Sequence, residues 1–85
     1  MSWKEDKEWQ KFKKGNTGNT GIIIVRVAEI VMLQLDKDID PEKINPKKMI
    51  KEADKYGEVT SMIGIYIAQA ILKIHPKGEF FIKNW

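Results

Sequence analysis

The chain has 85 residues, a net charge of +3 from 15 basic and 12 acidic side chains, and an apolar fraction of 42%. This length fits one small domain near the lower limit for an independent core, and the composition argues against wholesale disorder. No cysteine is present, which excludes disulfides, thiolate metal sites and cysteine nucleophiles and favours a reducing cytoplasm.

The first predicted element is a short helix over residues 2–14. Ser2 is a suitable N-cap, and Glu5 occupies the matching capping-box position. The aromatic residues of this segment lie on or near one side of the helix: Trp3, Trp9 and Phe12. The charged N-terminus lacks the apolar core of a signal peptide.

A tandem Gly-Asn-Thr repeat, GNTGNTG, follows at residues 15–21. Together with Lys13 and Lys14 it offers backbone N–H groups ahead of a helix N-terminus, an arrangement that binds anions. It lacks the Gly-Lys-Ser/Thr ending of a P-loop. The alternative interpretation is that Asn19 or Thr20 caps the next helix and the remaining residues form a flexible linker.

A second helix is predicted from Ile22 to about Leu35. Apolar side chains cover well over half of its circumference, so more than one neighbour is expected to cover it. This apolar stretch is shorter than a membrane span and contains three polar residues, Arg26, Glu29 and Gln34. A soluble, cytoplasmic protein is therefore expected.

An acidic segment, DKDIDPEKINPKK, breaks the helical pattern after Leu35. Its alternating aspartates resemble a calcium loop, but an EF-hand needs glycine and glutamate where Pro41 and Lys47 stand. A solvated acidic loop is expected in place of a metal site. Asp40-Pro41 and Asn45-Pro46 each have the pattern of an N-cap followed by proline at the first helical position.

A third helix is predicted over residues 46–74, with Gly57 either breaking it or absorbed into it. Four residues form one stripe along this helix: Met62, Tyr66, Gln69 and Lys73. Tyrosine can stack on a base, glutamine can read its edge and lysine can meet a phosphate. The alternative is that the stripe is simply the least buried side of a crowded helix. The lone His75 before Pro76 is interpreted as a helix-end residue.

These elements predict an all-α fold in a single domain over residues 1–85. Its parts are an N-terminal helix with a Gly-Asn-Thr linker over 1–21, an antiparallel helical hairpin over 22–75 and an aromatic tail over 76–85. The wide apolar arcs on so short a chain predict completion by homo-oligomerisation. The candidate ligand-binding residues are Lys13, Lys14, Asn16, Thr17, Asn19, Thr20, Arg26, Tyr66, Gln69 and Lys73. No catalytic, metal or cofactor site is predicted.

One sequence pattern resembles small phage- and prophage-encoded helical proteins of unassigned function. Its first half is VRVAE at Val25–Glu29 with the apolar stretch to Ile39. The second half comprises EAD at Glu52–Asp54, Gly57, Met62, Gly64, Ala70-Ile71-Leu72, Gly78-Glu79 and the closing Trp85. The resemblance implies a helical phage accessory protein acting in the host cytoplasm, and it supplies no catalytic residues.

Three functions fit these observations. The first is a non-catalytic, oligomeric binding protein that captures an anionic partner such as a nucleotide signal, or that blocks a host defence protein. The second is a nucleic-acid-binding protein, favoured by the aromatic and basic residues interleaved in WKEDKEWQKFKK. The third is a structural or assembly protein with no ligand.

Overall fold

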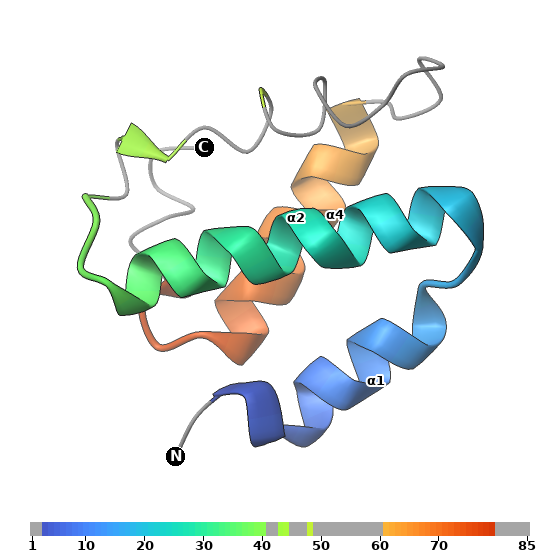
Figure 1. Cartoon of the computed structure of the whole chain (residues 1–85), viewed down its shortest axis with the longest axis horizontal. Helices are drawn as coiled ribbons and strands as arrows, with labels where there is room; N and C mark the ends of the chain where they lie inside the picture. The colour runs from blue at the N-terminus through green and yellow to red at the C-terminus, as the bar shows by residue number, and fades with distance from the viewer. Residues whose placement is uncertain (1–2, 41–42, 45–47, 49–60, 80–85) are drawn as a thin grey trace.

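The computed structural model describes residues 3–40, 43–44, 48 and 61–79, and within these ranges the chain is helical and has no strand. The elements are the 3-10 turn η1 (Trp3–Glu5), α1 (Lys7–Gly15), α2 (Gly18–Asp36) and α4 (Ser61–Ile74). In Figure 1, α2 runs across the middle of the molecule and α4 crosses it, and α1 packs against both. The predicted all-α class and the short N-terminal helix are confirmed.

The N-terminal helix begins later than predicted. The carboxylate of Asp6 accepts a hydrogen bond from the backbone N–H of Glu8 at 2.9 Å, so Asp6 is the N-cap of α1. The predicted capping box is therefore wrong: Glu5 belongs to η1, and Ser2 lies outside the described residues. The separate turn η1 brings the indole of Trp3 edge-on to Trp9, with ring centroids 5.2 Å apart.

The second helix begins at Gly18, four residues before the predicted start at Ile22. Gly18 has a φ of 80°, which glycine adopts without strain. A Cβ on Gly21 would lie 2.4 Å from the carbonyl carbon of Asn16, so only glycine fits there. The repeat thus ends α1 at Gly15, makes a tight corner at Asn16 and Thr17, and forms the first turn of α2 from Gly18. The prediction of a linker capped by Asn19 or Thr20 is therefore wrong.

The core is built on one face of α2. Its buried residues recur at three- and four-residue intervals: Ile24, Val27, Ala28, Val31, Met32 and Leu35. Residues of α4 and of the N-terminal segment complete this cluster: Ile67, Ala68, Ile71, Ile74, Trp3, Trp9 and Phe12. The small residues Ala28 and Ala68 are both buried in this cluster.

The two long helices do not form the predicted antiparallel hairpin. The C-terminal end of α2 meets the C-terminal end of α4, because Asp36 contacts His75. At the opposite end, Asn16 before α2 contacts Tyr66 in the first half of α4. The helices therefore cross steeply, as Figure 1 shows, with their C-terminal ends together.

By length and apolar composition alone, α2 could cross a membrane, because it is 19 residues long. The helix predicted from the sequence covered only Ile22–Leu35, so its length was underestimated. The inner face of α2 is occupied by the core of this domain, and core helices satisfy the same length and composition test as membrane spans.

Several predictions lie outside the described residues. These are the proline helix starts at 41 and 46, the helix over 46–60 with its possible break at Gly57, and the tail beyond Glu79. The described part of the tail turns back over the end of α4. A Cβ on Gly78 would lie 2.4 Å from the carbonyl oxygen of Ile71, so this turn also requires glycine.

Replacing Gly21 with alanine is expected to lower the free energy of unfolding by about 1–3 kcal/mol, because the new methyl group would collide with the backbone of Asn16. The matched control is Gly15→Ala, where a Cβ meets no atom within 4 Å. That control is expected to be neutral or mildly stabilising in the last turn of α1. Urea denaturation of the two variants measures the difference, and equal stabilities would refute the tight corner.

Candidate functional site

The carboxylate of Asp36 joins three segments of the chain. The indole Nε1 of Trp3 donates to its Oδ2 at 2.7 Å. The Nε2 of His75 lies 2.7 Å from its Oδ1. One side chain at the end of α2 therefore holds both η1 and the residue that follows α4, and the arrangement has the aspartate–histidine pairing found in many catalytic sites.

The hydrogen bonds of His75 indicate its tautomer. The backbone N–H of Lys77 donates to Nδ1 at 3.0 Å, so Nδ1 carries no proton and Nε2–H donates to Asp36. The ring is buried, and both of its nitrogens are occupied by the protein itself. His75 is therefore a structural link with no nitrogen left for a substrate. Sequence analysis placed it correctly at a helix end but missed its pairing with Asp36.

The first residues of the predicted acidic loop, 37–40, are exposed, and they form the C-terminal cap of α2. Asp38 adopts a φ of 57°, and its N–H donates to Leu35 while that of Ile39 donates to Gln34, both at 3.2 Å. This is a Schellman motif with aspartate in the left-handed position. The ammonium of Lys77 binds the carboxylate of Asp38 and the carbonyl of Leu35, where a cation is favoured by the helix dipole. Within the described residues, no group of three or more histidine, aspartate or glutamate side chains could hold a metal ion.

The pKa of Asp36 is lowered from its ordinary value of 3.8. Burial alone would raise it, but the hydrogen bonds from His75 and Trp3 outweigh that effect, and the charge of Lys4 adds to them. The carboxylate is consequently ionised wherever the protein is folded near neutral pH.

A separate cleft of about 270 Å³ lies between α1 and α4. Its walls combine two lysines, one carboxylate, an amide, two aromatic rings and two small or apolar residues. The lining residues are Glu8, Lys11, Phe12, Tyr66, Gln69, Ala70, Lys73 and Ile74. The rings of Phe12 and Tyr66 meet at 5.7 Å between centroids, inclined by 34°. This α1–α4 cleft is the candidate binding site.

One end of the α1–α4 cleft is tied to the corner that precedes α2. The side-chain amide of Asn16 donates to the carbonyl of Phe12 at 2.8 Å and to the hydroxyl of Tyr66 at 3.0 Å. Since the Tyr66 oxygen accepts this bond, its own O–H remains available to donate to a ligand. The corner and the cleft are therefore connected through one side chain.

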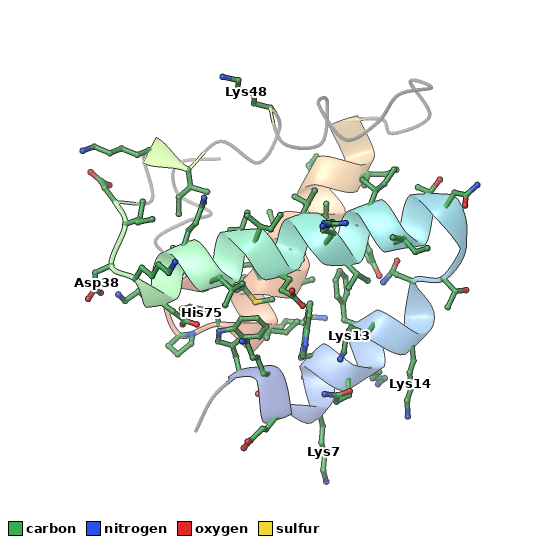
Figure 2. The ribbon with its side chains drawn as sticks, viewed as in Figure 1. Lys7, Lys13, Lys14, Asp38, Lys48 and His75 are labelled. Atoms are coloured by element: carbon green, nitrogen blue, oxygen red, sulfur yellow. The ribbon has the colours of Figure 1, made fainter. Side chains whose placement is uncertain are left out.

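The structure divides the predicted ligand-binding residues into two groups. Tyr66, Gln69 and Lys73 line the α1–α4 cleft together, and Asn16 contacts it through Tyr66. The remaining residues are not in its lining: Lys13, Lys14, Thr17, Asn19, Thr20 and Arg26. Figure 2 shows Lys13 and Lys14 on α1. The ammonium of Lys13 lies 5.6 Å from the ring centroid of Trp9. Thr17 is the N-cap of α2 and makes no side-chain capping bond.

Sequence analysis missed the contribution of α1 to this cleft. Glu8, Lys11 and Phe12 are spaced by three and four residues, which places them along one side of the helix. That spacing was visible in the sequence. What was not visible is that this side of α1 packs opposite Tyr66 and Lys73, because no local pattern specifies which two helices become neighbours.

No protein-family model matches the chain, and searches of curated proteins and of solved structures gave no match either.

The lowered pKa of Asp36 predicts a pH dependence of stability. Its contribution is fully present above the ordinary value of 3.8 and is lost as the pH falls through the lower pKa of the folded state. Asp36→Asn is expected to cost about 1–3 kcal/mol at neutral pH, through loss of charge-assisted hydrogen bonds. The stability gap between wild type and this variant should narrow in acid, as urea titrations at a series of pH values would measure. Glu29→Gln, at an exposed position on α2, is the control, and a gap that stays constant would contradict the prediction.

Proposed function

We propose that the α1–α4 cleft binds a small anionic ligand that carries an aromatic ring, such as a nucleotide, and that the protein acts by binding. The observation that carries the proposal is the lining itself, in which two lysines stand beside an exposed tyrosine and an amide. These are the groups that meet a phosphate, a base face and a base edge.

The positive charges of the two lysines in the cleft are available to bind an anion. Neither Lys11 nor Lys73 makes a hydrogen bond or ion pair with another described residue, and both are exposed. They come from facing helices, so an anion between them would be held from two sides. The carboxylate of Glu8 also lines the cleft, and its negative charge lowers the net positive charge that the two lysines give it. A carboxylate favours a ligand that also carries hydrogen-bond donors, such as ribose hydroxyls.

The aromatic side of the cleft suits a planar group. Tyr66 is 44% exposed although Phe12 and Asn16 hold it in place. A held but accessible ring loses little conformational entropy when a base stacks on it. Gln69 both donates and accepts hydrogen bonds, as base edges require. A volume of about 270 Å³ lies at the small end of ligand sites and favours a mononucleotide-sized group.

Calorimetric titration of mononucleotides tests the proposal. The double variant Lys11→Gln with Lys73→Gln is expected to weaken binding by about tenfold or more at low salt, because two charge-assisted contacts are lost. The matched control is Lys37→Gln with Lys43→Gln, which removes the same charge from two exposed lysines outside the cleft lining. Tyr66→Ala should remove stacking and weaken binding as well.

The substitution Glu8→Gln, in the same site, is expected to change the binding affinity in the opposite direction. Loss of the carboxylate is expected to strengthen binding of inorganic phosphate, since it removes a repulsive charge beside both lysines.

Equal nucleotide affinities in the wild type and the Lys11/Lys73 variant would overturn the assignment of this cleft.

We also propose that copies of the chain associate. Three large apolar side chains on α2 and α4 are strongly exposed, namely Ile22 at 61%, Ile65 at 53% and Leu72 at 45%. Exposed apolar surface of this kind favours association. This observation supports the assembly role as the second candidate function.

Sedimentation at micromolar concentration tests association. The wild type is expected above the monomer mass of 9.9 kDa, and Ile65→Glu with Leu72→Glu is expected to return it to that mass. A wild type that sediments as a monomer would contradict the proposal. Circular dichroism of the variant establishes that the helices are retained.

A further inference from the structure

A row of lysines follows the outer side of α1. Lys7, Lys11 and Lys14 are separated by four and three residues, so they share one face of the helix, and all three are exposed. Figure 2 shows Lys7 and Lys14 projecting from the same side of α1, away from α2. We refer to these three residues as the lysine row.

The lysine row works against the stability of its own helix. Like charges three and four residues apart repel each other. Lys7 also stands in the first turn of α1, where the positive end of the helix dipole disfavours a cation. The compensation within the helix is partial: Lys14 stands in the last turn, where the dipole favours a cation, and Glu8 lies one turn from Lys11. None of the three lysines makes a hydrogen bond or ion pair with another described residue. Sequence features that weaken local structure point to a function.

Lys11 belongs both to the lysine row and to the α1–α4 cleft. The row extends about 10 Å along the helix, from the rise of 1.5 Å per residue. A mononucleotide at Lys11 and Lys73 would leave Lys7 and Lys14 without a partner. A chain of phosphates running along α1 would meet all three lysines while one of its bases stacks on Tyr66.

We propose that the lysine row and the α1–α4 cleft together bind a short single-stranded oligonucleotide. This inference rests on the proposed function, because the cleft receives one base of the strand. It identifies the ligand as a polymer of nucleotides and adds Lys7 and Lys14 to the binding surface. The row supplies contacts that do not depend on base identity, as is usual for single-strand binding.

Two other polyanions fit the same observations less well. A membrane surface requires exposed apolar side chains beside the lysines, but Trp3, Trp9 and Phe12 of the N-terminal segment are buried. A duplex keeps its base faces stacked inside, so the exposed ring of Tyr66 would have nothing to contact. An unpaired strand uses both the charges and the ring.

Fluorescence anisotropy with a labelled ten-nucleotide oligothymidylate tests the inference, with thymidine monophosphate titrated in parallel by calorimetry. The oligonucleotide is expected to bind at least about tenfold more tightly than the monophosphate, since it releases more counterions. Lys7→Gln with Lys14→Gln should lower oligonucleotide affinity much more than monophosphate affinity. It should also reduce the slope of log affinity against log salt by about 1.4, from roughly 0.7 per phosphate contact.

The control is again Lys37→Gln with Lys43→Gln, which removes the same net charge elsewhere. Its slope of log affinity against log salt should equal that of the wild type. Equal affinities for oligonucleotide and monophosphate, or an unchanged slope in the Lys7/Lys14 variant, would overturn the inference while the proposed function stands. Tighter binding to a duplex of the same length, or to phosphatidylserine vesicles, would overturn it as well. Failure of the monophosphate to bind at all would refute the proposed function itself.

Discussion

The carboxylate of Asp36 brings together three segments of the described chain that lie far apart in the sequence. It accepts hydrogen bonds from Trp3 and from His75, which lie 33 and 39 residues away along the chain. Trp3 in turn packs edge-on against Trp9, and this positions α1. His75 places the end of α4 against the end of α2. Asp36 thus helps to position both helices that form the α1–α4 cleft, together with the contacts of Tyr66 with Phe12 and Asn16.

The sequence predicted the elements better than their arrangement. Helical periodicity, apolar runs and the spacing of Trp9 and Phe12 were sufficient for the all-α class and for α1. The predicted start of the first helix was wrong because Ser2 and Asp6 are equally suitable N-caps by sequence. Only tertiary packing decides between them. The prediction for the corner at Gly18 and Gly21 was wrong for a different reason. A glycine required by a positive φ, as at Gly18, or by the nearby backbone of Asn16, as at Gly21, looks the same in sequence as a glycine in a linker.

Direction was the largest error, and it carried over to the candidate site. An antiparallel hairpin is the usual result when two helices follow each other closely, but here α2 and α4 cross with their C-terminal ends together. With that arrangement the stripe of Tyr66, Gln69 and Lys73 faces α1 instead of the start of α2. The stripe itself was recognised from helical spacing. Its partners Glu8 and Lys11 could not be, because solvent-facing lysines and glutamates occur on almost every surface helix.

The hydrogen bond between Asn16 and Tyr66 spans 50 residues of sequence, and this has a consequence for how the molecule assembles. Small helical proteins usually fold fast because most of their contacts are local, whereas here the contacts that define the architecture require long loops to close first. Nine residues of α1 are too few to remain helical alone. The helix α1 therefore depends on its packing against α2 and α4. A molecule that bound in the cleft would contact both α1 and α4, and would thereby stabilise the folded chain as a whole.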